Sequence, residues 1–137
     1  MALSDAAVQK FLDTKRVVVL ATVQPDGAPL AMAMWVLHDP ETLTMISVDN
    51  LQKVRNLRRD PRVCVVAEAA DAQGIRGVVV QGRAEFLEDG PARRALVERF
   101  LAKYHPQLEE YWGGRVMPPN RVMFRIVPSK VLAWGLT

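Results

Sequence analysis

The stretch 47-SVDNLQKVRNLRRDPRV-63 decides how the rest of this 137-residue sequence is interpreted. A strand-like run ends at Asp49-Asn50, and residues 51–59 then carry four cations, at positions 53, 55, 58 and 59, before Asp60-Pro61. Because Asp and Asn favour the positions before a helix and proline ends one, the pattern predicts a strand, a short basic helix over residues 51–59, and a second strand beyond Pro61.

The start of this predicted helix has the features of an anion site. First-turn backbone N–H groups lack partners, and the helix dipole adds positive charge there. Asp49 or Asn50 stands where the cap is expected, Lys53 lies on the first turn, and Ser47 offers a hydroxyl from the strand side. A phosphate would suit this corner. In the alternative interpretation, Arg55 and Arg59, which fall on a helical face partly separate from Lys53, are simply solvated or contact a partner subunit.

Outward from this segment, apolar runs and turn residues predict a small, mainly antiparallel β-barrel. Too few crossover helices separate the strands for a doubly wound sheet. Gly77 and Gly82 indicate a bulge or a close backbone approach, and Pro128 predicts an interruption of the last strand. The predicted helices are 5–14, capped by Ser4, 51–59 and 90–104, with room for a fourth. The six predicted strands are 17–23, 30–37, 43–48, 62–69, 76–88 and 121–134.

Composition indicates one globular domain over residues 1–137. The sequence is 50% hydrophobic and 24% charged, with a net charge of +3 from 18 basic and 15 acidic residues. This small surplus, with few aromatics among the basic residues, does not indicate nucleic-acid binding. The first residues have no apolar signal region, and no uncharged run approaches the ~20 residues of a membrane span, so we expect a cytoplasmic protein without a membrane partner.

Other chemistries find little support among the reactive residues. His38 and His105 are far apart in sequence, and no Cys or His pair has metal-ligand spacing, so we expect no metal site. We expect Cys64 to be a small buried hydrophobe and His38 a surface residue at a strand end. Tyr111 and Trp112 either line a pocket or pack the end of a helix. The phosphate-binding Walker loop and the Gly-x-Ser-x-Gly elbow are both missing.

The order of these motifs resembles a known family. VVVLATVQPDGAP at 17–29, KVRNLRRDPRV at 53–63, RGVVVQGRAEFLE at 76–88 and RVMFRIVPSKVLAW at 121–134 are similar to the split β-barrel flavoprotein superfamily whose namesake is pyridoxamine 5′-phosphate oxidase. The resemblance covers essentially the whole chain. The segment 53–63 most resembles the branch that uses the deazaflavin coenzyme F420, and the implied fold is a six-stranded antiparallel split barrel with three or four short helices.

This resemblance implies a homodimer with its cofactor in a groove between subunits. Lys53 would be the phosphate cation, and the ring system would lie against the second strand. The residues implied around the phosphate and ribityl chain are Ser47, Val48, Asn50 and Gln52, with Arg55 close by. Those implied against the ring are Met34, Trp35 and Val36. The partner subunit would contribute Arg76, Gly77 and Val78, with Trp134.

The implied function is an F420-dependent reductase that transfers a hydride between the deazaflavin and a small conjugated or heterocyclic substrate. The alternatives are an FMN-binding oxidoreductase of the same fold and a non-catalytic flavin or haem carrier. Oxidase activity on pyridoxamine phosphate is not expected, because Gln52 replaces the arginine that commonly precedes the helix lysine, and the C-terminal Arg/His segment that grips the vitamin phosphate is missing. No acid/base pair identifies a catalytic side chain.

Overall fold

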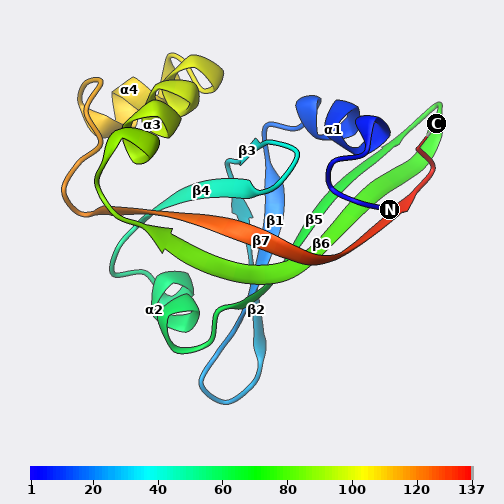
Figure 1. The fold of residues 1–137 in the computed structure, drawn as a ribbon, viewed down its shortest axis with the longest axis horizontal. Coiled ribbons are helices and arrows are strands. Elements are labelled where there is room, and N and C mark those ends of the chain that lie inside the picture. The colour runs from blue at the N-terminus through cyan, green and yellow to red at the C-terminus, as the bar shows by residue number, and fades with distance from the viewer. Residues whose placement is uncertain (137) are drawn as a thin grey trace.

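The computed structural model describes residues 1–136, in which one antiparallel sheet curls into a barrel with helices at its ends (Figure 1). The order of strands in the sheet is β2-β1-β5-β6-β7-β4-β3. The strands are β1 Val18–Val23, β2 Pro29–Met34, β3 Leu37–His38, β4 Leu43–Val48, β5 Arg62–Asp71, β6 Gly74–Leu87 and β7 Arg121–Trp134. The helices are α1 Ala6–Asp13, α2 Gln52–Arg59, α3 Pro91–Lys103 and α4 Gln107–Trp112.

The predicted mainly antiparallel split barrel is confirmed, but the predicted second strand, 30–37, is two strands. β2 pairs with β1 at one edge of the sheet, and β3 pairs with β4 at the other edge. The residues described therefore form seven strands instead of six. Since only Trp35 and Val36 separate the two pieces, this break carries the chain from one edge of the sheet to the other and closes the barrel.

The break has a specific cause in the buried side chain of Tyr104. Its hydroxyl accepts a hydrogen bond from the Val36 N–H at 2.7 Å and can donate to the carbonyl of Val36 at 3.0 Å or of Arg16 at 2.9 Å. The Lys103 ammonium also donates to the Val36 carbonyl at 2.6 Å. Because Lys103, the last residue of α3, and Tyr104, which follows it, satisfy both backbone groups of Val36, this residue needs no strand partner.

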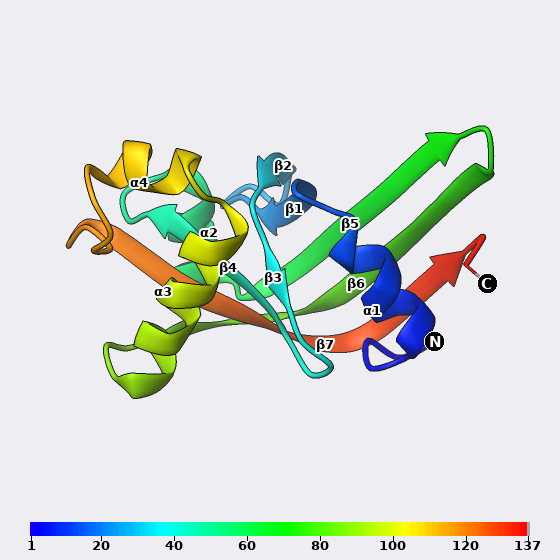
Figure 2. The ribbon, with the colours of Figure 1, turned by 90° about the horizontal axis from the view of Figure 1, so that it is seen from above.

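Two hydrophobic clusters hold the elements together. The larger fills the barrel, where alternate residues of each strand point inward, as the period of two requires. The smaller packs α3 and α4 against β3, β4 and β7, and consists of Leu37, Phe100, Leu101, Tyr104, Leu108 and Met123. Figure 2 shows α3 and α4 at one end of the barrel and α1 at the other. No helix within residues 1–136 is long and apolar enough to cross a membrane.

The bulge predicted near Gly82 is confirmed, whereas the predicted interruption at Pro128 is wrong. β7 continues through Pro128, which lies opposite Gly82 where the β6–β7 register shifts. A Cβ on Gly82 would collide with the Val127 carbonyl. Pro128 has no backbone N–H to donate to the β6–β7 ladder. Because the register shift occurs at the same position, the strand continues through Pro128 instead of ending there.

Two local predictions are also corrected. Asp5 instead of Ser4 occupies the N-cap position of α1, and its carboxylate accepts a hydrogen bond from the Ala2 N–H at 3.0 Å. Cys64 is only half-buried, because its side chain lies on the outer face of β5 while the neighbouring Val63 and Val65 point into the barrel. Partial burial still raises the pKa of the Cys64 thiol.

We predict that Tyr104→Phe lowers the free energy of unfolding by about 1 to 3 kcal/mol, because the Val36 N–H loses its acceptor inside the protein. Urea denaturation at constant m-value measures this loss. Tyr111→Phe is the matched control: Tyr111 is 72% exposed, so its hydroxyl should contribute less than about 0.5 kcal/mol. Equal effects of the two substitutions would contradict the role assigned to Tyr104.

Candidate functional site

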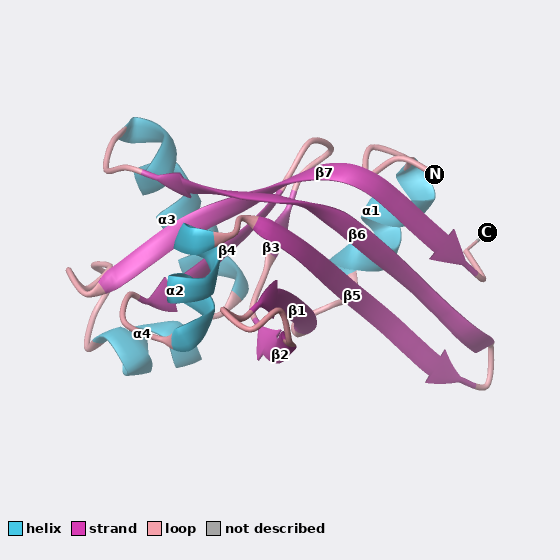
Figure 3. Ribbon diagram, turned by 90° about the horizontal axis from the view of Figure 1, so that it is seen from below, coloured by secondary structure: helices cyan, strands magenta, loops and turns pink. Residues whose placement is uncertain are grey.

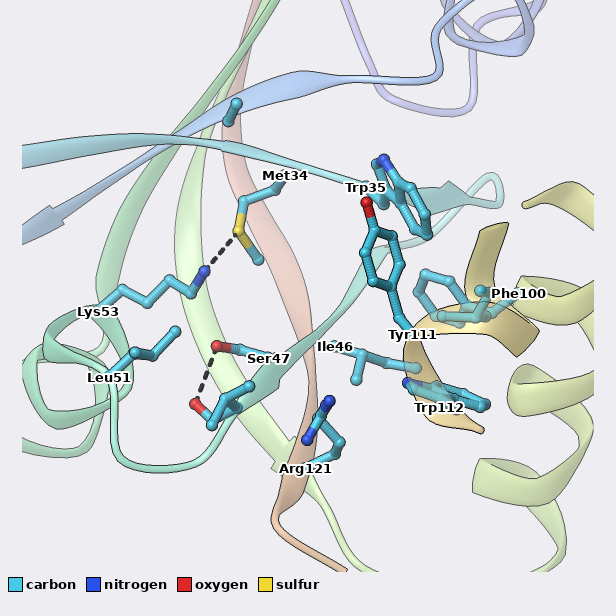
Figure 4. A pocket seen from close by; sticks show the side chains of 13 residues that line it. Met34, Trp35, Ile46, Ser47, Leu51, Lys53, Phe100, Tyr111, Trp112 and Arg121 are labelled. Atoms are coloured by element: carbon cyan, nitrogen blue, oxygen red, sulfur yellow. Dashed lines mark hydrogen bonds between the residues drawn. The ribbon is translucent and has the colours of Figure 1, made fainter. Parts of the chain in front are cut away.

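A cavity of about 430 Å³ opens where the start of α2 faces the aromatic residues of α3 and α4 (Figure 4). Figure 3 shows α2 and α4 at the same end of the molecule, beside β4. Apart from Ser47, the side chains around the cavity are apolar, aromatic or basic, and none carries a carboxylate. They are Ala33, Met34, Trp35, Ile46, Ser47, Val48, Leu51, Lys53, Phe100, Leu108, Tyr111, Trp112 and Arg121.

The predicted helix at 51–59 is confirmed as α2, but its predicted cap is wrong. Leu51 occupies the N-cap position instead of Asp49 or Asn50, and no side chain caps the first turn. Asp49 is held elsewhere, because its N–H bonds to the Asn120 carbonyl at 2.9 Å, beyond the β4–β7 ladder. The first-turn N–H groups of α2 are therefore free of side-chain acceptors, as an anion-binding helix end requires.

Asn56 fixes the orientation of α2 against the barrel. Its fully buried side chain donates to the Thr22 hydroxyl of β1 at 3.0 Å and accepts from the Gln52 amide at 2.8 Å. Val54 and Leu57 are buried on the same side of the helix. This packing turns Lys53 inward, although lysine is seldom buried without a partner.

Lys53 is 7% exposed, and its ammonium donates to the Met34 sulfur at 3.1 Å. Among the described residues no carboxylate lies within ion-pairing distance of this ammonium. A thioether is a weak acceptor, so most of the hydrogen-bonding capacity of the ammonium is unused. Burial accordingly lowers the pKa of Lys53 below its ordinary value. A cation in this condition is suited to bind an anion that enters the cavity.

Ser47 lies next to this cation in the cavity wall. Its buried hydroxyl donates to the Val48 carbonyl at 3.0 Å, so its oxygen remains able to accept a further hydrogen bond. Figure 4 shows Ser47 between the Lys53 side and the Arg121 side of the cavity. Arg121, at the start of β7, is the cross-strand neighbour of Val48. The polar end of the cavity thus combines a helix start, one hydroxyl and the Lys53 cation, and Arg121 lies on the other side of Ser47.

The opposite end of the cavity is aromatic. Trp35 stacks on the buried Tyr104 with ring centroids 4.3 Å apart and planes at 4°, and Tyr111 is tilted toward Trp35 at 5.8 Å. Phe100 and Trp112 complete this wall. The Tyr104 contact that breaks the strand therefore also sets the plane of Trp35. Such a wall suits a flat conjugated ring.

Five of the predicted site residues line this cavity: Met34, Trp35, Ser47, Val48 and Lys53. Val36 does not, because its side chain is 1% exposed and belongs to the barrel core. Asn50, Gln52 and Arg55 lie beside the cavity and contact one another, since Arg55 donates to the Asn50 carbonyl at 2.5 Å and to the Gln52 amide oxygen at 2.7 Å. These three residues shape the first turn of α2.

The four residues assigned to the partner subunit lie together at the far end of the sheet. Arg76 pairs with Asp71 at 2.8 Å, and the Trp134 ring covers Gly77, where any Cβ would collide with it. The side chain of Val78 is buried in the barrel, so only its backbone is available to a ligand. Within a single chain, these four residues do not lie at the cavity that contains Lys53.

The sequence interpretation missed Ala33, Ile46, Leu51, Phe100, Leu108 and Arg121 as cavity residues. Local sequence pattern gave no signal for Arg121, because its strand pairs with the strand that ends at Val48, far away in the sequence. Two interpretations were open for Tyr111 and Trp112, and the structure agrees with both. The two residues line the cavity, and Trp112 also packs against the smaller hydrophobic cluster.

The histidines belong to other parts of the structure. His38 is at the end of β3, as expected, but its side chain is only 10% exposed and lies 2.7 Å from Asp13 and 2.8 Å from Gln9, joining β3 to α1. Burial lowers the pKa of His38 despite the nearby Asp13 carboxylate. Within residues 1–136 no group of three or more His, Cys, Asp or Glu side chains could hold a metal ion.

We predict that Lys53→Met stabilises the unliganded protein at neutral pH, by on the order of 1 kcal/mol, because an apolar side chain removes a desolvated charge. Since the pKa of Lys53 is lowered in the folded state, the unfolded chain binds more protons between that value and 10.5, and stability rises with pH across this interval. The substitution should flatten that rise. Chemical denaturation at several alkaline pH values measures it.

The exposed Lys10 supplies the control, since Lys10→Met should change neither the stability nor its pH dependence. A loss of stability in Lys53→Met at neutral pH would mean that the ammonium has a stabilising partner in the unliganded protein.

Comparison with known proteins agrees with this architecture. A curated pyridoxine/pyridoxamine 5′-phosphate oxidase from Thermobifida fusca is 29% identical, over 86% of this chain and 68% of its own length. A conserved hypothetical protein from Mycobacterium tuberculosis has a solved structure that is 30% identical, with a TM-score of 0.79 over 95% of this chain and 83% of its own. A solved F420 reductase is 28% identical, with a TM-score of 0.59 over 85% of this chain and 88% of its own.

More distant structures share the fold alone. One is a haem-binding protein from Mycobacterium smegmatis, at 20% identity and a TM-score of 0.80 over 98% of this chain and 55% of its own. The family model described as pyridoxamine 5′-phosphate oxidase matches residues 4–135, which is nearly the whole sequence. The chain therefore belongs to the pyridoxamine 5′-phosphate oxidase-like split β-barrel superfamily.

Proposed function

We propose that this protein is an F420-dependent oxidoreductase, which transfers a hydride between the deazaflavin coenzyme and a small conjugated or heterocyclic substrate. The observation that carries the proposal is the buried Lys53 ammonium, which lacks a counter-ion among the described residues and faces a cavity with aromatic walls. An oxidoreductase of this superfamily needs both features, since its cofactor has an anionic phosphate and a flat ring.

The residues present fit such a cofactor. Lys53, the Ser47 oxygen and the first-turn N–H groups of α2 would hold the phosphate, while Met34 and Trp35 would lie along the ring. When bound, the deazaflavin supplies the hydride chemistry. No Asp, Glu, His or Cys lines the described cavity, so the chain's own residues bind and orient the ring, and proton exchange is left to water or to the Tyr111 hydroxyl in the cavity wall.

The preference for F420 over FMN rests on two observations. The solved F420 reductase is 28% identical to this chain over the aligned residues. Arg55 is exposed at the start of α2, where the anionic tail of the deazaflavin would leave the cavity. Arg58 and Arg59 add no support, because Arg58 stacks on Phe86 at 4.2 Å and Arg59 donates to the Val23 carbonyl.

A homodimer forms part of the proposal, with a cytoplasmic location and no nucleic-acid or membrane partner. Five cross-strand neighbours form a continuous apolar row on the outer face of the sheet, here called the outer row: Ala33, Val19, Val66, Val79 and Leu132. Val19 is 41% and Leu132 46% exposed. Because Ala33 also lines the cavity, a second subunit on the outer row would adjoin the cofactor. A twofold axis there would bring Arg76, Gly77 and Trp134 of the partner toward it.

We predict that Lys53→Met weakens binding of the deazaflavin coenzyme roughly 10- to 150-fold, because one charge-assisted contact of about 1.5 to 3 kcal/mol is lost. Quenching of coenzyme fluorescence during titration measures the dissociation constant. Arg58→Met, on the same helix but outside the cavity, should stay within twofold of the unmodified protein. An unchanged constant in Lys53→Met would remove this residue from the site.

The alternatives are separated by the absorption spectrum of the purified protein. Bound yellow FMN would favour the FMN-binding oxidoreductase, and a Soret band would favour the haem carrier. A colourless protein that binds the deazaflavin supports the proposal, and turnover of an electron acceptor by the reduced coenzyme then distinguishes an enzyme from a carrier.

The dimer is tested by Val19→Asp, which places a charge in the middle of the outer row. We expect the mass measured by light scattering to fall from twice the chain mass to the chain mass, and coenzyme binding to weaken with it. Val116→Asp is the control, because Val116 is 80% exposed and lies outside the outer row. A Val19→Asp protein that is still dimeric would place the interface elsewhere.

A further inference from the structure

Arg121 is a second cation in the cavity, and no role described above uses it. Its guanidinium donates to the Asn120 side chain at 2.6 Å, and no carboxylate in the described part of the chain lies within ion-pairing distance of it. Of the twelve other arginines, five face carboxylates in the described part of the chain, namely Arg62, Arg76, Arg94, Arg115 and Arg125. Arg121 therefore keeps most of its donors for a ligand.

The two cations of the cavity point to different places. Lys53 is on α2 and its ammonium points toward Met34, whereas Arg121 comes from β7 and its guanidinium lies on the other side of Ser47, in the direction of Ile46 (Figure 4). A ligand with one anionic group satisfies only one of them. The cavity has no acidic side chain to neutralise the other.

We propose that the aromatic end of the cavity is a subsite for a planar conjugated carboxylate, with Arg121 binding the carboxylate. This inference rests on the proposed function, for which it names the class of substrate. Arginine presents a flat pair of N–H donors that matches a carboxylate. The wall formed by Tyr111 and Trp112, beyond the Trp35 assigned to the cofactor ring, matches a flat conjugated body. The phosphate of the cofactor stays with Lys53.

The test uses two probes of the same shape, 2-naphthoate and its neutral analogue 2-naphthamide. Isothermal titration of the unmodified protein should show at least tenfold tighter binding of the naphthoate. Arg121→Gln should abolish this preference, and Arg121→Lys should restore part of it, because an ammonium keeps the charge but not the paired donors. Arg125→Gln is the matched control, since Arg125 is exposed on the same strand and faces Glu85.

Lys53→Met tests the roles of the two cations separately. It removes only the phosphate cation, so the preference for naphthoate over naphthamide should persist. Three results would overturn the assignment of this subsite. They are loss of the preference in Lys53→Met, persistence of the preference in Arg121→Gln, and no binding of naphthoate at all. The carboxylates of the deazaflavin tail are the other possible source of the anion. A tenfold loss of coenzyme affinity in Arg121→Gln, absent for a deazaflavin without the tail, would overturn the assignment to a substrate.

The carboxylate subsite and the F420-dependent function give different results when each is absent. A protein that binds the coenzyme but shows no Arg121-dependent preference between the probes loses only the carboxylate subsite. A protein that shows the preference but binds no deazaflavin retains the subsite as an aromatic-acid site and loses the F420 assignment.

Discussion

The hydrogen bonds between Tyr104 and the backbone of Val36 are the interaction on which the rest of this structure depends. They satisfy Val36 outside the sheet, so the chain can leave one edge at Met34 and join the opposite edge at Leu37. The same tyrosine stacks on Trp35. One buried side chain therefore closes the barrel and sets the plane of an aromatic residue in the cavity, which couples the stability of the fold to the shape of the site.

The cavity also shows a conflict between stability and binding. Asn56 anchors α2 to Thr22 and so directs Lys53 into the protein, where its charge is desolvated and has only a thioether for a partner. A structural lysine would be expected on the surface or beside a carboxylate. Local unfavourable placement of this kind is typical of functional sites, where a ligand completes the interaction that the protein leaves unfinished.

Sequence reasoning located the polar end of the site better than its aromatic end. Residues 47–53 are close in sequence, so a strand followed by a helix was enough to bring Ser47 and Lys53 together. Trp112 and Arg121 reach the same cavity from positions 59 and 68 residues beyond Lys53, and local pattern carries no information on contacts at that separation. The predicted second strand failed for the same reason: the partner that breaks it, Tyr104, is 68 residues from Val36.

The sequence by itself determined the antiparallel class of the fold, the strands other than the divided one, the basic helix that begins after Leu51, and the resemblance to the split-barrel superfamily. These features depend on periodicity, turn residues and neighbouring motifs. Only the tertiary structure decided that the second strand divides between two edges, that Lys53 is buried without a counter-ion among the described residues, and that Arg121 joins it in one cavity. Each of these follows from contacts between segments distant in sequence, which are selected by packing and not by local propensity.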